Sequence, residues 1–229
     1  YSTFLDFLVN KQEGEAAAKV WARMVQLQQP VDSKHAINYE RYLIASKQPD
    51  QARMVWQQAA PICGLQSYQP TSQNLVVNGD FSHDILNGGF DWIYHQSNDV
   101  ALALDPTQPH TSSRSLMITF DSRGIEDSGI RHLVWVEPNT RYQFSAYSKS
   151  DDIQGAGGPR FAIQDLFSSD MFFASEELKG QNYWKQETGF FTTGSDTKII
   201  VIRVQRFPPH TAIRGKLWID GVRLVKLHS

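Results

Sequence analysis

The sequence predicts an α + β multidomain chain, in which a short helical segment precedes an all-β sandwich. Over the first 63 residues, apolar side chains recur at three- and four-residue spacing, which is typical of helices. From residue 74 onward, short runs of alternating apolar and polar residues are separated by turns rich in Gly, Pro, Asn and Asp, which is typical of a sandwich. We therefore expect a helical domain over 1–63, a linker over 64–73 and a β domain over 74–229.

Composition excludes several functional classes. The chain has 229 residues, 22 Lys and Arg against 24 Asp and Glu, and a net charge of -2. A broad basic surface for nucleic acid is therefore absent, and no nucleic-acid partner is expected. No long apolar stretch suggests a membrane span. The single cysteine, Cys63, excludes an internal disulfide and a multi-cysteine metal site, and we interpret it as a structural residue.

The helical pattern repeats. The first predicted helix places Phe4, Phe7 and Leu8 on one face, and the second places Ala17, Val20 and Trp21 on another. Equivalent residues stand 35 positions later, at Tyr39, Tyr42, Leu43, Ala52, Val55 and Trp56. Self-similarity at this period indicates a helix-turn-helix repeat.

The Ala-x3-aromatic spacing of the second helices, Ala17 with Trp21 and Ala52 with Trp56, and the closing Pro61 resemble a tetratricopeptide-type repeat. The resemblance implies a scaffold that binds a protein partner, and a related helical-repeat class fits as well. Trp21 and Trp56 are expected in the core because they recur at regular helical positions. Since about three repeats are needed for a stable array, we expect the chain to be a fragment with more repeats before Tyr1.

Nine strands are predicted in the second part, over 75–81, 100–104, 115–120, 130–136, 142–149, 160–167, 184–193, 198–205 and 216–227. A short helix over 174–178 is the one possible interruption.

The stretch 132–149 is predicted to form two strands joined by a turn at Pro138-Asn139-Thr140. If Val134, Val136, Tyr142, Phe144 and Ala146 face the core, the alternation places Trp135, Gln143, Ser145, Tyr147 and Lys149 together on the opposite face. Two aromatic rings among polar side chains predict a docking platform for a flat, hydroxylated ligand.

Six local motifs follow one another in a recognisable order: Asn78-Gly79-Asp80-Phe81, Phe90-Asp91-Trp92, Ser115-Leu116, the stretch 136–149, Trp184 with Phe190-Phe191, and the stretch 217–224. In this order they resemble the carbohydrate-binding modules of the family 4/9/22 type over residues 74–227. The resemblance implies a jelly-roll sandwich with the galactose-binding-like fold that binds an oligo- or polysaccharide and performs no chemistry. It also implies an extracytoplasmic location, in the periplasm or on the cell surface, as for a bacterial-type exported protein.

The predicted sugar-binding residues combine the alternation with this resemblance. Trp135 and Tyr147 are expected to stack on sugar rings. Arg203 and Gln205 point outward if Ile200, Ile202 and Val204 point inward, and Gln143 and Gln164 are predicted to join them. The alternative is that the two aromatic residues cover the sheet or pack against the helical domain, in which case the chain has a structural or protein-interaction role without sugar binding.

Related modules also carry a structural calcium near the first and last strands. Asp220 stands at the aspartate position of the family and Asp80 is nearby, so these are the candidate ligands. The acidic residue that follows the Asn-Gly-x-Phe motif in the family is Ser82 here, so a vacant or weak site is expected.

No enzymatic activity is predicted. Ser82, His83 and Asp84 are sequence neighbours, whereas a catalytic triad needs groups converging from separate elements. A hydrolase is therefore the least favoured function.

Overall fold

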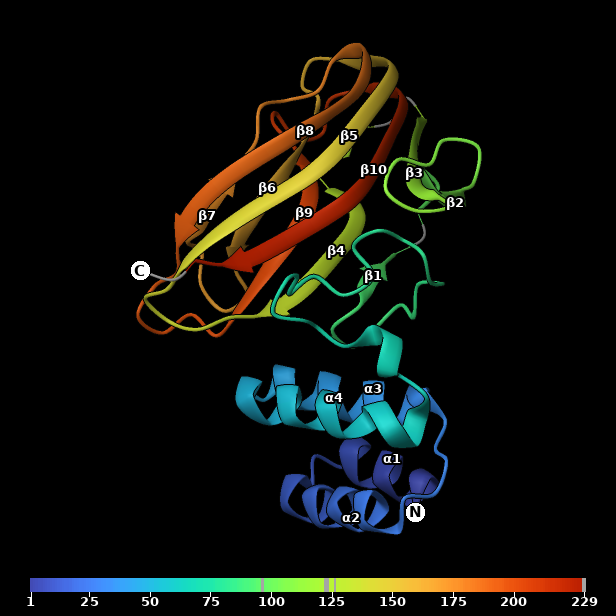
Figure 1. Ribbon diagram of the computed structural model, residues 1–229, viewed down its shortest axis with the longest axis vertical. Helices are drawn as coiled ribbons and strands as arrows, with labels where there is room; N and C mark the ends of the chain where they lie inside the picture. The colour runs from blue at the N-terminus through green and yellow to red at the C-terminus, as the bar shows by residue number, and fades with distance from the viewer. Residues whose placement is uncertain (96, 122–123, 126, 228–229) are drawn as a thin grey trace. The chain divides into compact units, whose positions relative to one another are not determined.

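The computed structural model describes residues 1–95, 97–121, 124–125 and 127–227, and divides them into two compact units. The helical unit comprises Tyr1–Gln69 and Gly88–Phe90, and the sandwich unit comprises Pro70–Asn87 and Asp91–Ser229. The expected order of helices followed by an all-β sandwich is confirmed (Figure 1).

The helical unit contains four α-helices and a short 3₁₀-helix: α1 Ser2–Asn10, α2 Gly14–Leu27, α3 Ser33–Ala45, α4 Pro49–Cys63 and η1 Gln66–Tyr68. Local sequence explains several of their ends. The Asp32 side chain accepts a hydrogen bond from the Lys34 backbone N–H at 3.0 Å, which caps α3. Pro49 opens α4, where its missing N–H is not needed, and Gly64 ends it in the left-handed conformation with φ 68°. None of the described helices combines the length and apolar character needed to cross a membrane.

Three pairs of residues 35 positions apart are buried in the helical core. Leu8 and Leu43, Ala17 and Ala52, and Trp21 and Trp56 are all buried. Each indole N–H has an acceptor, Gln58 Oε1 for Trp21 at 2.7 Å and the Tyr68 carbonyl for Trp56 at 2.8 Å. The predicted core position of both tryptophans is confirmed.

Of the predicted apolar face of α1, Leu8 is buried but Phe4 and Phe7 are not. Phe4 and Phe7 are 53% and 52% exposed and stack on each other, whereas Leu5, Leu8 and Val9 are buried. Two apolar sets compete for the core on this short helix, and the sequence spacing alone could not distinguish between them.

Burial raises the pKa of the Cys63 thiol to about 11, which disfavours the nucleophilic thiolate.

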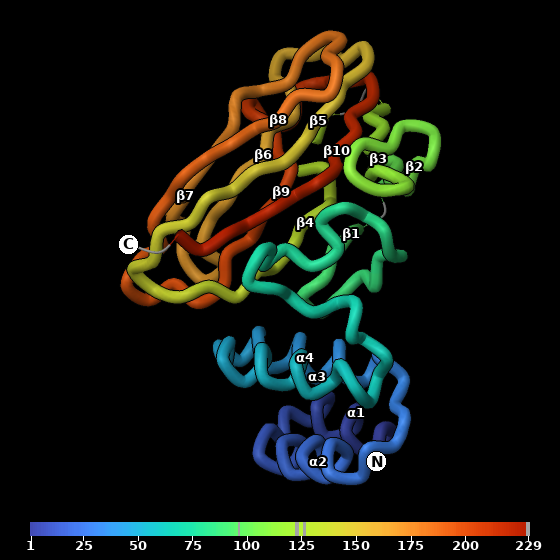
Figure 2. Tube along the Cα trace, in the orientation of Figure 1, coloured from blue at the N-terminus to red at the C-terminus, as the bar shows by residue number. Residues whose placement is uncertain are grey.

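The sandwich consists of two five-stranded antiparallel sheets (Figure 2). The β4 sheet has the order β1-β4-β9-β6-β7, formed by Trp92–Tyr94, Asp127–Trp135, Ile199–Arg206, Pro159–Asp165 and Met171–Ala174. The β5 sheet has the order β2-β3-β10-β5-β8, formed by Val100–Asp105, Ser115–Asp121, Ile213–Lys226, Arg141–Gly155 and Gly180–Thr192.

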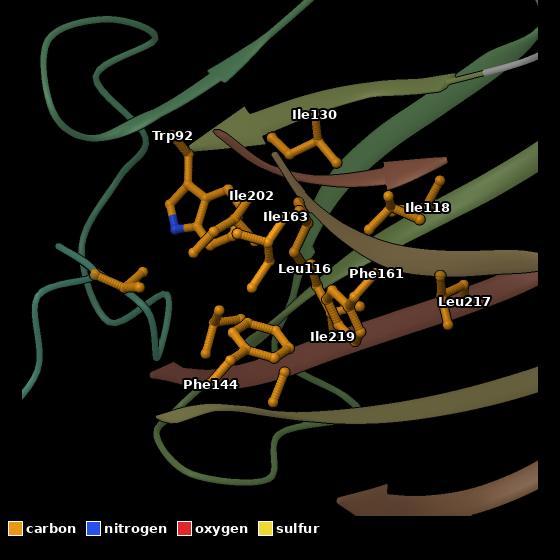
Figure 3. Packing of buried hydrophobic residues seen from close by; sticks show 14 of the residues in the cluster. Trp92, Leu116, Ile118, Ile130, Phe144, Phe161, Ile163, Ile202, Leu217 and Ile219 are labelled. Atoms are coloured by element: carbon orange, nitrogen blue, oxygen red, sulfur yellow. The ribbon is translucent and has the colours of Figure 1, made fainter. Parts of the chain in front are cut away.

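One apolar layer fills the space between the sheets. Inward-pointing residues such as Ile130, Ile202 and Ile163 from the β4 sheet meet Phe144 and Ile219 from the β5 sheet (Figure 3). Phe144 and Phe161 pack edge to face with ring centroids 5.5 Å apart. The inward positions predicted for Val134, Val136, Tyr142, Phe144 and Ala146 are confirmed by their burial.

Two predicted elements are not formed, and two short strands were not predicted. Residues 75–81 form turns instead of a strand, although the Leu75 N–H donates to the Leu224 carbonyl and the Val222 N–H donates to Gly79. Positive φ angles at Asn78 and Phe81 prevent regular pairing. No helix forms over 174–178, and the short strands β1 and β7 were not predicted.

Buried polar groups join the sandwich core to its loops. The fully buried His132 ring hydrogen-bonds through Nε2 to the Val77 carbonyl at 3.0 Å, and burial lowers the pKa of His132 to about 4, so the ring is neutral and Nε2 donates. Arg206 is 1% exposed and donates to the carbonyl groups of Gly157, Ile125 and Thr211. This one guanidinium therefore holds three loops together.

Glu40 generates a prediction about the stability of the helical unit. It is 2% exposed, its Oε1 has no hydrogen-bond partner among the described residues, and burial raises its pKa from 4.5 to about 8. The pKa of Glu40 is higher in the folded state than in the unfolded state. The stabilising contribution of its protonated carboxyl is therefore full below about pH 4.5 and is lost as the pH rises towards 8. We expect Glu40→Gln, which cannot ionise, to raise the free energy of unfolding at pH 9 by on the order of 2–4 kcal/mol.

The measurement is guanidinium unfolding at pH 5 to 9, followed by circular dichroism at 222 nm. Glu15→Gln, at an exposed position of α2, is the matched control and should leave the pH dependence unchanged. Equal pH profiles for wild type and Glu40→Gln would contradict the assignment.

Candidate functional site

The outer face of the β4 sheet presents side chains from three adjacent strands, β4, β9 and β6. Ile130, Ile202 and Ile163 point into the core (Figure 3), so the alternating residues of the same strands point outward. Four predicted site residues lie in this outward set: Trp135 on β4, Arg203 and Gln205 on β9, and Gln164 on β6.

Strand register arranges this face in rows. Arg131 is opposite Arg203, Leu133 is opposite Val201, and Trp135 is opposite Ile199. On the other side of β9, Gln164 pairs with Val201 and Arg160 with Gln205. Trp135, Arg203 and Gln164 are half-buried, but Gln205 is only 6% exposed. Gln205 therefore points outward as predicted but offers little accessible surface to a ligand.

Tyr147 and Gln143 do not share this face, which corrects the predicted platform. Both lie on β5, and β5 belongs to the other sheet, between β10 and β8. They point away from the core on the outer face of the β5 sheet, so the sandwich core separates them from Trp135. The predicted pairing of Trp135 and Tyr147 on one surface is wrong.

The connection between β4 and β5 explains this error. The Val136 N–H donates to the Lys198 carbonyl at 2.9 Å, which continues the pairing of β4 with β9. The chain then crosses from one sheet to the other, where Arg141 pairs with Thr192 of β8. A Pro-Asn-Thr turn is compatible with both a hairpin and a crossing between sheets, and alternation does not identify a strand's partner.

Trp135 is an aromatic residue on the β4 sheet face. The Lys198 ammonium lies 5.6 Å from the centre of its ring, in a cation–π arrangement. A ligand that stacks on this ring would meet the ammonium group, which can donate to hydroxyl oxygens.

The arginines of this face have few partners. Arg203 Nη1 lies 3.5 Å from Asp127 Oδ2, and Arg160 Nη2 lies 3.9 Å from Glu177 Oε2. The Nε atoms of both arginines are buried and have no hydrogen-bond acceptor among the described residues. Their side chains nevertheless remain 25% and 23% exposed, so the outer guanidinium nitrogens can reach a ligand.

The outer face of the β5 sheet carries an aromatic cluster that the sequence analysis missed. The His110 ring lies 4.0 Å from Tyr147 and 5.0 Å from Trp184, measured between ring centroids. Trp184 alternates with polar residues of β8, a signal that becomes informative only once β8 is known to pair with β5. His110 comes from the loop between β2 and β3, and no local pattern places it there.

Asp220 fixes that loop and does not fit a calcium site. Its buried carboxylate accepts hydrogen bonds from the backbone N–H groups of His110 at 2.9 Å and Thr111 at 2.8 Å, from the Thr111 hydroxyl, and from the Gly221 N–H at 2.6 Å. Both oxygens are therefore occupied by donors.

Asp80 does not complete a metal site either. Its Oδ1 accepts from the backbone N–H of Ser82 at 3.2 Å and from its hydroxyl at 2.9 Å. Within the described parts of the chain, no three His, Cys, Asp or Glu residues come close enough to hold a metal ion. The assignment of Asp220 and Asp80 as calcium ligands is thus not supported by the donors that surround them.

The Ser82, His83 and Asp84 sequence has structural partners. Ser82 donates to Asp80 instead of to a histidine, and Asp84 Oδ1 forms an ion pair with Arg114 Nη2 at 2.9 Å. These contacts are those of a polar turn.

A cleft of about 750 Å³ opens beside β2, away from the face described above. Its walls are formed by apolar residues such as Leu102, Leu104, Tyr94 and Ile85 and by the polar residues Asp84, Ser97 and Asn98. Leu116 and Ile130 of the core also line it. A hydroxyl-rich ligand needs several converging polar partners, and the β4 sheet face provides them from adjacent strands.

Comparisons with known proteins agree with the fold. A family model described as a carbohydrate binding domain matches residues 73–210. Among solved structures, a candidate sugar-binding protein from Bacteroides thetaiotaomicron aligns with a TM-score of 0.52 and 12% identity over 68% of this chain and 100% of its own. A family 4 carbohydrate-binding module aligns at 0.48 and 16% identity over 66% of this chain and 99% of its own. The family 22 xylan-binding domain of Paenibacillus barcinonensis Xyn10C aligns at 0.43 and 13% identity over 66% and 93%. No curated protein sequence matches the chain.

The Asp220 network predicts that stability is independent of calcium. We expect EDTA and millimolar CaCl₂ to leave the Tm of the sandwich unchanged, because hydrogen-bond donors satisfy both carboxylate oxygens. Asp220→Ala should lower the free energy of unfolding by about 2–4 kcal/mol, since several donors lose their acceptor at once. Differential scanning calorimetry measures both effects, and a fall in Tm with EDTA would contradict the network as described.

Proposed function

We propose a glycan-binding function from the premise that the chain belongs to the family of carbohydrate-binding domains. In this proposal the sandwich binds an oligo- or polysaccharide on the outer face of the β4 sheet and does not change it chemically. The observation that carries the proposal is the convergence of Trp135, Arg203 and Gln164 from three adjacent strands on one face.

Each of these residues has a physical role in the proposal. The Trp135 ring offers an apolar surface to the C–H groups of a pyranose ring. The Gln164 amide both donates and accepts hydrogen bonds, and the Arg203 guanidinium donates several. A sugar hydroxyl has the same dual character, so the set suits a hydroxylated ligand. The β-sheet backbone holds all three in place, which reduces the entropy lost on binding.

The outer face of the β5 sheet is the alternative location. Tyr147, with Gln143 on the same strand, was predicted as a ligand residue, and Tyr147 joins the aromatic cluster with Trp184 there. The β4 sheet face is favoured because the Nε atoms of Arg160 and Arg203 lack acceptors among the described residues, whereas the loop held by Asp220 already packs on the other face.

The helical unit is proposed as a tetratricopeptide-like scaffold over 1–63, followed by a linker over 64–73 and the binding domain over 74–229. The equivalent buried positions 35 residues apart support a repeat. The exposed, stacked rings of Phe4 and Phe7 favour contact with a protein partner.

Replacing both phenylalanines by serine should abolish capture of such a partner without changing glycan binding. Capture that persists in this variant would contradict the scaffold role of the helical unit. By analogy with the family, the protein is proposed to act outside the cytoplasm.

Trp135→Ala tests the glycan-binding proposal. We expect affinity for a polysaccharide retained by the wild type to fall by roughly tenfold or more, because stacking on an aromatic ring contributes about 1–2 kcal/mol or more at the centre of a site. Affinity electrophoresis in gels containing different soluble polysaccharides, followed by calorimetry, measures the change.

The matched control is Trp184→Ala, which removes the same side chain from the opposite face. It should leave the affinity unchanged. Loss of binding in Trp184→Ala with retention in Trp135→Ala would move the site to the β5 sheet, and no retention of the wild type by any glycan would refute the function.

A further inference from the structure

Two arginines stand directly opposite each other on the outer face of the β4 sheet. Arg131 of β4 pairs in register with Arg203 of β9. Side chains at such positions have Cβ atoms about 4.5–5.5 Å apart, and like charges there destabilise the sheet. Arg131 is exposed and forms no ion pair or hydrogen bond with the described residues.

A third guanidinium extends this cluster onto the next strand. Arg203 pairs with Ala162 of β6, and Arg160 lies two residues before Ala162 on the same face. Arg160 is therefore a diagonal neighbour of Arg203, at roughly 7–8 Å. Arg131, Arg203 and Arg160 form what we call the arginine cluster.

Within the described residues, the counter-charges of the cluster are few. The Asp127 carboxylate lies 3.5 Å from Arg203, and the Glu177 carboxylate lies 3.9 Å from Arg160 but only 2.8 Å from Lys179. The Nε atoms of Arg160 and Arg203 lack an acceptor in the same part of the chain. Among the described residues, two carboxylates thus lie near three cations, and one of them pairs more closely with Lys179.

This arrangement suits an anionic ligand. Guanidinium groups bind carboxylate and sulfate through paired N–H···O bonds that a neutral hydroxyl cannot match. A ligand anion would also remove the repulsion between Arg131 and Arg203, so part of the binding free energy comes from strain in the free protein. Lys198, beside Trp135, adds a further positive charge to the same face.

We propose that this face selects an acidic polysaccharide, whose carboxylate or sulfate groups bind the arginine cluster while a sugar ring stacks on Trp135. The inference rests on the proposed glycan-binding function and adds the ligand class. Arg131 and Trp135 are four residues apart on β4, or roughly 13 Å, so the ligand is a chain of several sugars with more than one contact.

The test uses the whole chain and two matched pairs of polymers. Polygalacturonate is compared with the same polymer methyl-esterified, which lacks the charge, and dextran sulfate is compared with dextran. Calorimetry should show binding of the charged member about tenfold or more tighter than the neutral one, and this preference should weaken between 50 and 500 mM NaCl. The two pairs distinguish carboxylate from sulfate recognition.

Arg131→Glu is the decisive variant. It should abolish the preference for the charged polymer and raise the Tm by about 1–3 °C, because an opposite charge replaces a like charge beside Arg203. Lys216→Glu makes the same charge change at an exposed position of β10 in the other sheet, and should preserve the preference. A variant that lost the preference because it was unfolded would lower the Tm, so the rise in Tm separates the two explanations.

The outcomes separate this inference from the proposed function. Equal binding of charged and neutral polymers that Trp135→Ala abolishes and Arg131→Glu does not would overturn the inference and leave the function intact. Absence of binding to either kind of polymer would refute both. Equally tight binding of a single-stranded DNA oligonucleotide, lost in Arg131→Glu, would show a general anion site and overturn the selection of an acidic glycan.

Discussion

Burial of one apolar layer between two five-stranded sheets is the constraint on which the rest of the sandwich depends. Ile130, Ile202 and Ile163 from one sheet and Phe144 and Ile219 from the other interdigitate in it (Figure 3). Because successive side chains of a strand alternate between its two sides, filling this layer also decides which residues face solvent. The proposed binding face is in this sense a consequence of the core.

The outer faces of the two sheets differ in how their polar groups are paired. On the β5 sheet, Asp220 draws the loop of His110 and Thr111 onto the strands, so polar groups there satisfy one another. On the β4 sheet, Arg131 and Arg203 are placed side by side, and two guanidinium Nε atoms have no acceptor in the part of the chain that the structure describes. Polar atoms left unsatisfied lower stability, and such arrangements are concentrated where a protein binds something. Because of this contrast, we propose the outer face of the β4 sheet, and not that of the β5 sheet, as the glycan-binding face.

Both units contain buried polar groups that affect the stability of the fold. Arg206 joins three loops of the sandwich, and His132 links the core to the turn at Val77. Glu40, by contrast, is buried in the helical unit with an oxygen that lacks a partner among the described residues. The Arg206 guanidinium is satisfied by three carbonyl groups, whereas His132 is bonded through Nε2 alone and its buried Nδ1 has no partner among the described residues. The carboxyl of Glu40 is tolerated because its raised pKa keeps it largely neutral at moderate pH.

The sequence by itself determined the order of the two domains, most strands and their inward residues, because apolar periodicity is a local property that burial enforces. It also placed Trp135, Arg203 and Gln164 on outward positions. Only the tertiary structure decided that β4 and β5 belong to different sheets, which separates Trp135 from Tyr147. It also decided that Gln205 is buried and that the Asp220 carboxylate accepts hydrogen bonds from backbone donors. The opposition of Arg131 and Arg203 likewise depends on strand register. Partner choice and register arise from contacts between residues distant in the chain, so no local pattern encodes them.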